Sequence, residues 1–256
     1  MNFFWVYDIS NLYLFLIVAV FFVLIGVIGF LITKHFVERW LGPSPVSIHM
    51  VIGFIEIIGV FYGITLGLIA AAMWGNYNAT KAVLSKEASY LGCMYKGAEG
   101  FPEPVRTELK KELKEITRYI IEEAWPIQER GLIPMGGRTS KLENIMYNFN
   151  PKTEGEEIIF SKELDLLYLM LEIRRERKEN ILSGLPEELY LVLFVGAIIN
   201  ISITWFLVAT KKGLHIMITA LAGVLIGSLV FLVIAMDYPY RGPDAYQIIY
   251  NDVMRE

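Results

Sequence analysis

One carboxylate lies within an otherwise apolar stretch of the chain, and its type and position suggest chemistry most directly. Glu56 precedes three glycines at four-residue intervals, Gly59, Gly63 and Gly67. On a helix that turns about 100° per residue, Gly63 and Gly67 lie within about 20° of Glu56. A carboxylate near the centre of a membrane costs about 2.5–3.5 kcal/mol, which makes an intramembrane glutamate a functional candidate. A ring of such carboxylates around a shared axis can select ions.

The predicted pore-lining set consists of the residues on or beside this helix face: Glu56, Gly59, Tyr62, Gly63, Gly67, Ala70 and Trp74. Two other interpretations of the same residues remain open. Small residues at four-residue spacing are the usual means by which membrane helices pack closely. Aromatic residues also gather where a helix meets the membrane surface, and a glutamate near a helix start can extend to that surface.

Two further groups of polar residues follow membrane spans. Asn78, Lys86 and Glu87 are candidates for lining a vestibule, although a surface ion pair between Lys86 and Glu87 is the simpler interpretation. Asp237, Pro239 and Arg241 form a membrane-exit motif, in which the proline would end the helix and the two charges could anchor it. With one cysteine, three separated histidines and no nucleophile–base pair or phosphate loop, the sequence predicts no metal, no cofactor and no enzyme.

The elements that must position these residues are membrane helices. Apolar residues make up 55% of the 256 positions, too many for a water-soluble domain unless they are concentrated in spans. A helix needs about 20 apolar residues to cross a bilayer. Four segments meet this requirement, at about residues 12–33, 46–74, 189–210 and 214–236.

Most charged residues fall between the second and third spans. Helical periodicity at 106–125 and 161–182, and a Ser140–Glu143 capping-box pattern, predict helices there, with 150–155 as a loop. Residues 74–96 are expected to extend the second span as a helix. The fold class is therefore an all-α membrane protein with a helical soluble domain inserted between spans two and three. The predicted domains are hairpin one (1–74), the soluble domain (75–188), hairpin two (189–237) and a tail (238–256).

Positive charge near the span ends indicates the orientation of the chain. The short loops carry Lys34, Arg39, Lys211 and Lys212, whereas the soluble side carries more, at Lys81, Lys86, Arg174, Arg175, Arg177 and Lys178. Because cytoplasmic flanks are enriched in Lys and Arg, we expect a multi-pass cell-membrane protein with the soluble domain and both termini in the cytoplasm.

Several segments, taken in order, resemble the bestrophin-like membrane family. They are GVFYGITLGLIAAAMWGNY (59–77), KEASYLGCMY (86–95), FPEPVRTEL (101–109), EEAWP (122–126), SGLPEELYLVLFVGA (183–197), LHIMITALAG (214–223) and IAMDYPYRGP (234–243). The last of these contains the membrane-exit motif. The family's name records a likeness to bestrophins, which are pentameric anion channels. The resemblance therefore implies a homo-oligomeric channel-like membrane protein, with a pentamer as the expected assembly, and supplies no catalytic residues.

The resulting prediction is a homo-oligomeric ion channel with span two around the pore and the helical domain as a cytoplasmic vestibule. Its partners would be the lipid bilayer, further copies of itself and a permeant inorganic ion. A net charge of −4 gives no indication of nucleic-acid binding. Two alternatives stay open: an ion-driven stator or transport-energising subunit with a partner peptide, and a non-conducting membrane scaffold or signalling protein. The sign of the ion is also open, since bestrophins suggest anions and a Glu56 ring favours cations unless it is protonated.

Overall fold

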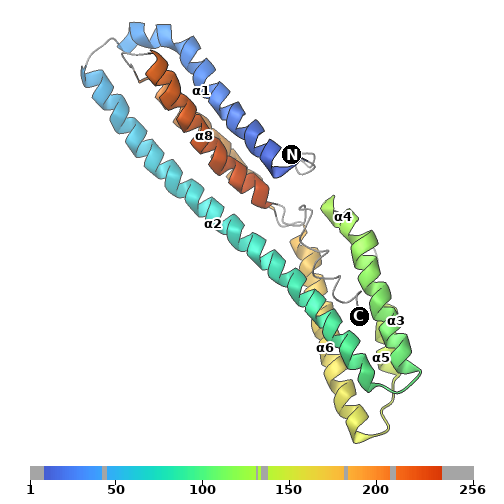
Figure 1. The fold of residues 1–256 in the computed structure, drawn as a ribbon. Coiled ribbons are helices and arrows are strands. Elements are labelled where there is room, and N and C mark those ends of the chain that lie inside the picture. Colours follow the sequence, from blue (N-terminus) through green and yellow to red (C-terminus); the bar gives the residue numbers. More distant parts are fainter. Residues whose placement is uncertain are drawn as a thin grey trace. The chain divides into compact units, whose positions relative to one another are not determined.

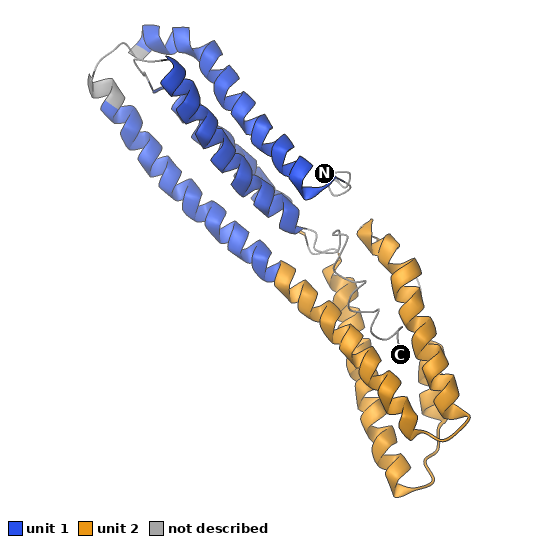
Figure 2. Ribbon diagram, in the orientation of Figure 1, with its two compact units in different colours: residues 1–76, 185–237 blue, residues 77–184, 238–256 orange. Residues whose placement is uncertain are grey.

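A computed structural model describes residues 9–41, 45–130, 132–133, 138–181, 184–207 and 212–237. Within these residues the chain is helical and contains no strand. It divides into two compact units (Figure 2). Of the described residues, unit 1 comprises those in 9–76 and 185–237, and unit 2 those in 77–184. The predicted tail 238–256, with Pro239 and Arg241, lies outside the described residues.

Unit 1 contains four helices long and apolar enough to cross a membrane, which confirms the predicted fold class. They are α1 (Asn11–Leu41), the first part of α2 (Pro45–Gly97), α7 (Glu187–Thr204) and α8 (Lys212–Asp237) (Figure 1). The protein is thus a multi-pass membrane protein. Helix α2 continues beyond the apolar stretch as expected, and α1 also continues past the predicted end of its span at residue 33.

Helix α7 is shorter than the predicted span 189–210. It ends at Thr204, and the amides of Trp205, Phe206 and Leu207 each bond to the carbonyl three residues earlier. Bonds of this kind tighten the last turn of a helix and bring it to an end. The span was predicted from its lack of charge, a criterion that does not detect this change of hydrogen-bonding pattern. Residues 208–210 lie outside the described part of the chain.

Two glycines on α8 bring this helix close to α1. A Cβ added at Gly223 would lie 2.9 Å from the Cα of Val23, and one added at Gly227 would lie 2.8 Å from the Cα of Ala19. Glycines four residues apart on one helix face allow such backbone contact in membranes. The core of unit 1 forms from buried residues of the four helices and of the segment just before α7: Phe22, Leu66, Ile69, Met73, Leu185, Leu193, Ala197, Ile201, Val230 and Val233.

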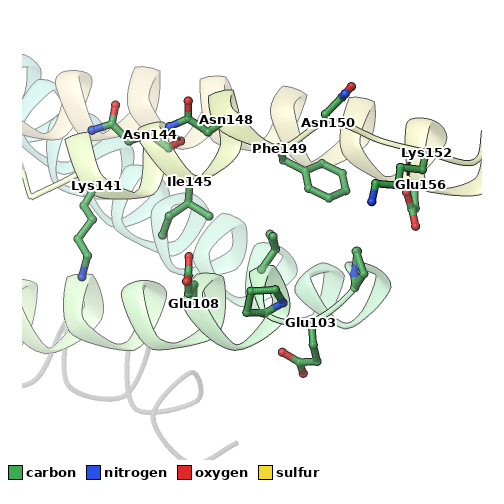
Figure 3. Close-up of a pocket in the computed structure, with 13 residues that line it drawn as sticks. Glu103, Glu108, Lys141, Asn144, Ile145, Asn148, Phe149, Asn150, Lys152 and Glu156 are labelled. Carbon is green, nitrogen blue, oxygen red and sulfur yellow. Dashed lines mark hydrogen bonds between the residues drawn. The ribbon is translucent and has the colours of Figure 1, made fainter.

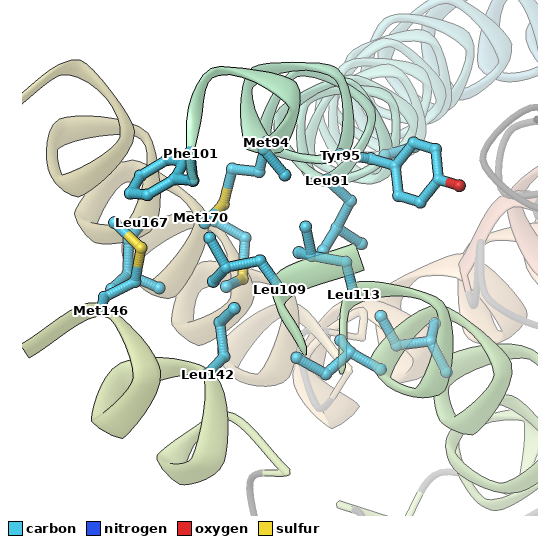
Figure 4. Close-up of a cluster of buried hydrophobic side chains, with 14 residues drawn as sticks. Leu91, Met94, Tyr95, Phe101, Leu109, Leu113, Leu142, Met146, Leu167 and Met170 are labelled. Carbon is cyan, nitrogen blue, oxygen red and sulfur yellow. The ribbon is translucent and has the colours of Figure 1, made fainter. Parts of the chain in front are cut away.

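Unit 2 combines the last part of α2 with shorter helical segments. These are η2 (Ala98–Gly100), α3 (Val105–Tyr119), the π-helical turn η3 (Ile120–Ala124), α4 (Trp125–Glu129), α5 (Ser140–Asn148) and α6 (Glu154–Asn180). Side chains from α2, α3, α5 and α6 meet in one apolar core (Figure 4), whose labelled members include Leu91, Met94, Leu109, Leu113, Leu142, Met146, Leu167 and Met170.

Two helix boundaries in unit 2 differ from prediction. The capping box predicted from Ser140 and Glu143 does not form. The N-cap residue of α5 is Thr139, one position earlier, and its side chain makes no capping hydrogen bond. Helix α6 begins at Glu154, within the predicted loop 150–155 and before the predicted start at 161. Its N-cap is Thr153, whose hydroxyl accepts a bond from the Glu156 amide at 3.2 Å. A threonine followed three residues later by glutamate is itself a capping-box pattern, so the sequence contained the signal.

Candidate functional site

Helix α2 presents three different faces within unit 1. Tyr62, Leu66, Ile69 and Met73, three or four residues apart, pack into the core. These spacings place them on one side of the helix. The exposure of the other two faces of α2 shows which predicted pore-lining residues are accessible to lipid, water or another protein chain.

The second face carries the small residues and is not covered by the described part of this chain. A Cβ added at Gly63 or Gly67 would meet no atom within 4 Å. Glu56 is exposed, and Trp74 keeps 54% of its surface. At about 100° per residue, these four residues lie within about 20° of one line along the helix. We call Glu56, Gly63, Gly67 and Trp74 the small-residue face.

The third face of α2 carries large apolar side chains. Ile57, Ile64 and Leu68 lie about 80–120° around the helix from Glu56. They are 58%, 59% and 68% exposed, respectively. In a membrane helix such a surface suits lipid tails or an apolar partner. The small-residue face therefore lies between a packed face and a face fitted to apolar surroundings.

The structure separates the predicted pore-lining residues into two groups. Tyr62 points into the unit, where its hydroxyl donates to the Leu193 carbonyl at 2.8 Å and its ring lies against Gly196. Ala70 is half-buried beside the core. Gly59 is half-buried too, and a Cβ there would lie 3.9 Å from the Asn200 side-chain oxygen. Gly59, Tyr62 and Ala70 thus lie toward the unit interior. Of the predicted pore-lining set, the residues of the small-residue face are the ones that the described part of the chain leaves exposed.

The vestibule candidates are also separated. Asn78 and Lys86 are exposed, whereas Glu87 is completely buried. Instead of pairing with Lys86, Glu87 pairs with two arginines of α6: its Oε2 lies 2.5 Å from Arg177 Nε, and its Oε1 lies 3.7 Å from Arg174 Nε. Glu87 therefore lies inside unit 2, away from the surface of the unit.

Arg177 joins three helices of unit 2. Besides Glu87 on α2, it contacts Gln128 on α4, to whose side-chain oxygen its Nη1 donates at 2.7 Å. Arg177 and Gln128 are each 1% exposed. Burial, with the positive charges of Arg174 and Arg177 nearby, lowers the pKa of Lys178. In the sequence, these arginines were interpreted only as positive charges near the ends of the membrane spans. Arg174 and Arg177 follow the buried Met170 by four and seven residues, and this helical spacing was the available sign that they lie on the buried face of α6.

Asp237 of the membrane-exit motif connects the end of α8 to the start of α7. Its carboxylate is completely buried and accepts hydrogen bonds from the Leu185 amide and the Tyr190 hydroxyl. A buried carboxylate requires such donors, because an unpaired one would be costly. This contact holds the open ends of the second hairpin together.

One cavity lies in unit 2, between the start of α3, α5 and the segment before α6 (Figure 3). Its volume is about 600 Å³. The lining combines apolar side chains such as Ile145 and Phe149 with the amides of Asn144, Asn148 and Asn150. It includes no histidine, cysteine, serine or threonine, and its titratable side chains are Glu103, Glu108, Lys141, Lys152 and Glu156. Elsewhere in the described residues, no group of His, Cys, Asp or Glu could hold a metal ion.

The all-helical fold of the described residues and the four apolar helices define a multi-pass membrane protein. The chain belongs to the bestrophin-like family, since the family model for the Bestrophin-like domain matches residues 20–248. This match confirms the resemblance seen in the sequence and extends it to include Glu56. No curated protein and no solved structure matches the chain.

Proposed function

We propose that this protein is a homo-oligomeric ion channel in which copies of α2 surround the pore. The observation that supports this most directly is the small-residue face, which the described part of the chain leaves uncovered although it carries Glu56. A carboxylate against lipid would be costly. A water-filled axis shared by several subunits would solvate it, and the absence of side chains at Gly63 and Gly67 would widen that axis.

The bestrophin-like family supports a channel, and the likeness to bestrophins suggests five subunits that pass anions. A ring of ionised Glu56 side chains would favour cations. Neighbouring carboxylates repel one another, so part of such a ring would be protonated near neutral pH and would then oppose anions less. The sign of the ion therefore depends on the protonation of the ring, which flux measurements on the reconstituted protein at several pH values test.

Unit 2 would form a cytoplasmic vestibule, with Asn78 and Lys86 exposed on the part of α2 that belongs to it. The membrane-flanking charges at Lys81, Lys86 and Arg175 favour this side. Exposed Cys93 reports the orientation. A membrane-impermeant maleimide should label it only after intact cells are permeabilised, and labelling before that step would place unit 2 outside.

The test of the channel is the unmodified protein in liposomes, with fluxes of K⁺, Na⁺ and Cl⁻ compared with those of Glu56→Gln. Glu56→Gln should change the ratio of anion to cation flux and weaken its pH dependence, because the charge of the ring is removed. Glu38→Gln is the matched control, since Glu38 is a carboxylate on α1 that lies 3.4 Å from Lys34. Identical selectivity and pH response in wild type and Glu56→Gln would remove Glu56 from the pore.

A second candidate follows from the same uncovered face. A partner helix could occupy it, as in an ion-driven stator or transport-energising subunit, because small residues admit close packing. The composition of the purified complex separates the two. A single kind of polypeptide with a multiple of the 29.2 kDa chain mass supports the homo-oligomeric channel, whereas a second polypeptide supports the stator.

A further inference from the structure

Asn200 is a polar residue in the apolar helix α7 of unit 1, and its side chain is half-buried. Its Nδ2 donates to the carbonyl of Gly196, four residues earlier in the same helix, at 2.9 Å. Since only the nitrogen of the amide can donate, this bond fixes which atom is Oδ1. The amide oxygen faces α2, where it would lie 3.9 Å from a Cβ added at Gly59. Asn200 therefore presents an acceptor to α2 at a position where α2 has no side chain.

The contact between Asn200 and α2 is not a hydrogen bond. Asparagines of membrane helices commonly bond across to a neighbouring helix. Here the amide nitrogen is used within α7, and the backbone amides around Gly59 belong to the continuous helix α2. Within the described residues no donor reaches Asn200 Oδ1. An amide oxygen that faces hydrocarbon without a donor is costly, so this position suits an oxygen in contact with water or a cation.

The position of Gly59 places Asn200 beside the small-residue face. Taking about 100° per residue from Glu56, Gly59 lies at about −60°, between the small-residue face at about 0° and the centre of the packed face at about −110°. Along the helix, Gly59 follows Glu56 by about 4.5 Å. The oxygen of Asn200 thus flanks the small-residue face, about one helical turn from the carboxylate.

The polar atoms around this face are mostly acceptors. The hydroxyl groups of Thr65 and Ser202 donate to carbonyls of their own helices at 2.9 and 2.7 Å, and the Tyr62 hydroxyl donates to a carbonyl of α7. The spans 46–74 and 189–210 contain no Lys or Arg. The first basic residue after Glu56 is Lys81, which lies in unit 2. Oxygen acceptors and carboxylates replace the water around a cation, whereas an anion requires donors or positive charge.

We propose that Asn200 is a second pore-facing residue, which provides its amide oxygen beside the Glu56 carboxylate, and that the permeant ion is a cation. This inference rests on the proposed channel, in which copies of α2 surround the pore. Each subunit would then contribute a carboxylate and an amide oxygen to neighbouring levels of the axis. The likeness to bestrophins alone suggests an anion, so the two sources of inference give opposite predictions.

Flux measurements on the full chain in liposomes test both parts of the proposal. Under a KCl gradient, the unmodified protein should pass K⁺ in preference to Cl⁻. Asn200→Asp adds a negative charge with almost the same shape. It should raise the ratio of K⁺ to Cl⁻ permeability at least about fivefold, because a charge about 8 Å away favours a cation and disfavours an anion by about 2.4-fold each even in water. Asn144→Asp is the matched control, since Asn144 is exposed on α5 of unit 2, and it should leave the ratio unchanged.

A second measurement needs no ion flux. In a Cys93→Ser background, Asn200→Cys and Ser202→Cys in liposomes are treated with a charged, water-soluble methanethiosulfonate, and the modified fraction is measured by mass spectrometry. Ser202 lies about 200° around α7 from Asn200 and so faces the other side of the helix. Because a thiol reacts as its thiolate, which requires water, Asn200→Cys should react at least about tenfold faster than Ser202→Cys.

The outcomes separate this inference from the proposed channel. A preference of the unmodified protein for Cl⁻ would overturn the assignment of a cation. Either an unchanged permeability ratio in Asn200→Asp or equal reaction of the two cysteines would overturn the role of Asn200, and a changed ratio in Glu56→Gln would show that the channel itself stands. An unmodified chain that passes neither ion would overturn the proposed function and this inference together.

Discussion

The carboxyl group of Glu163 lies directly against Gly97, the last residue of α2, in space that any side chain at position 97 would need. Glu163 belongs to the buried face of α6, four residues before Leu167 and seven before Met170, and is only 6% exposed. A carboxyl group at a core position loses its hydration, and this burial raises the pKa of Glu163 to about 7.

The raised pKa of Glu163 predicts a pH-dependent stability of unit 2. The folded state holds this proton up to about pH 7, whereas the ordinary pKa is 4.5. The contribution of Glu163 to the stability of the fold is therefore largest below pH 4.5, and this contribution is lost as the pH rises through 7. Thermal unfolding of the full chain between pH 5 and 8 should show this decline. Glu163→Gln should flatten it, and an unchanged slope in the variant would assign the decline to other groups.

Gly97→Ala should destabilise the same contact. The backbone at Gly97 is helical, with φ −64° and ψ −27°, so alanine meets a steric conflict with Glu163 and no backbone strain. Overfilling a packed site costs about 1–3 kcal/mol. Gly155→Ala in α6 is the matched control, because a Cβ there meets nothing within 4 Å, and it should be neutral or stabilising by up to about 1 kcal/mol. Combining Gly97→Ala with Glu163→Ala should restore part of the stability that Gly97→Ala removes. If the free-energy changes of the two single variants simply add in the double variant, the two positions are not in contact.

Much of the fold follows from periodicity and apolar length, which are local properties of the sequence. The spans, the long α2 and the helical unit 2 were predictable for this reason. The helix predicted at 106–125 does not end before Pro126, because the helical path continues through the π-turn at 120–124 into α4. A π-turn changes the hydrogen bonding of the preceding carbonyls and so accommodates the proline, which has no backbone N–H to donate.

The site was less predictable, because its contacts join distant parts of the chain. Glu87 and Arg177 are 90 residues apart and pair in the interior, and no local pattern in the sequence shows that the two meet. The glycine spacing on α2 is similarly ambiguous. Gly223 and Gly227 on α8 have the same spacing and make a close helix contact, whereas Gly63 and Gly67 make none within the described chain. Spacing predicts a smooth face, and only the surrounding helices decide what covers it.

Arg177→Met should destabilise unit 2 strongly, because it leaves the buried Glu87 carboxylate with the more distant Arg174. Removing one partner of a buried ion pair costs about 3–5 kcal/mol. Arg175→Met is the control on the same helix turn, since Arg175 forms an exposed pair with Glu179 at 3.0 Å and should change the stability by less than about 1 kcal/mol. Denaturant unfolding of the two variants measures the difference. Equal stability of the two variants would mean that the buried contacts of Glu87 with Arg177 contribute no more than a surface ion pair.

The most direct test of the account compares two neighbouring residues of α2 in the reconstituted protein. Gly63 lies on the small-residue face, and Ile64 lies on the large apolar face. In a Cys93→Ser background, Gly63→Cys and Ile64→Cys are each treated with a charged, water-soluble methanethiosulfonate while ion flux into liposomes is recorded. A thiol reacts as its thiolate, which requires water. The account predicts that the flux of Gly63→Cys is blocked at least about tenfold faster than that of Ile64→Cys. Modification of Ile64→Cys at the same rate or faster, or no block of Gly63→Cys, would contradict a pore lined by this face.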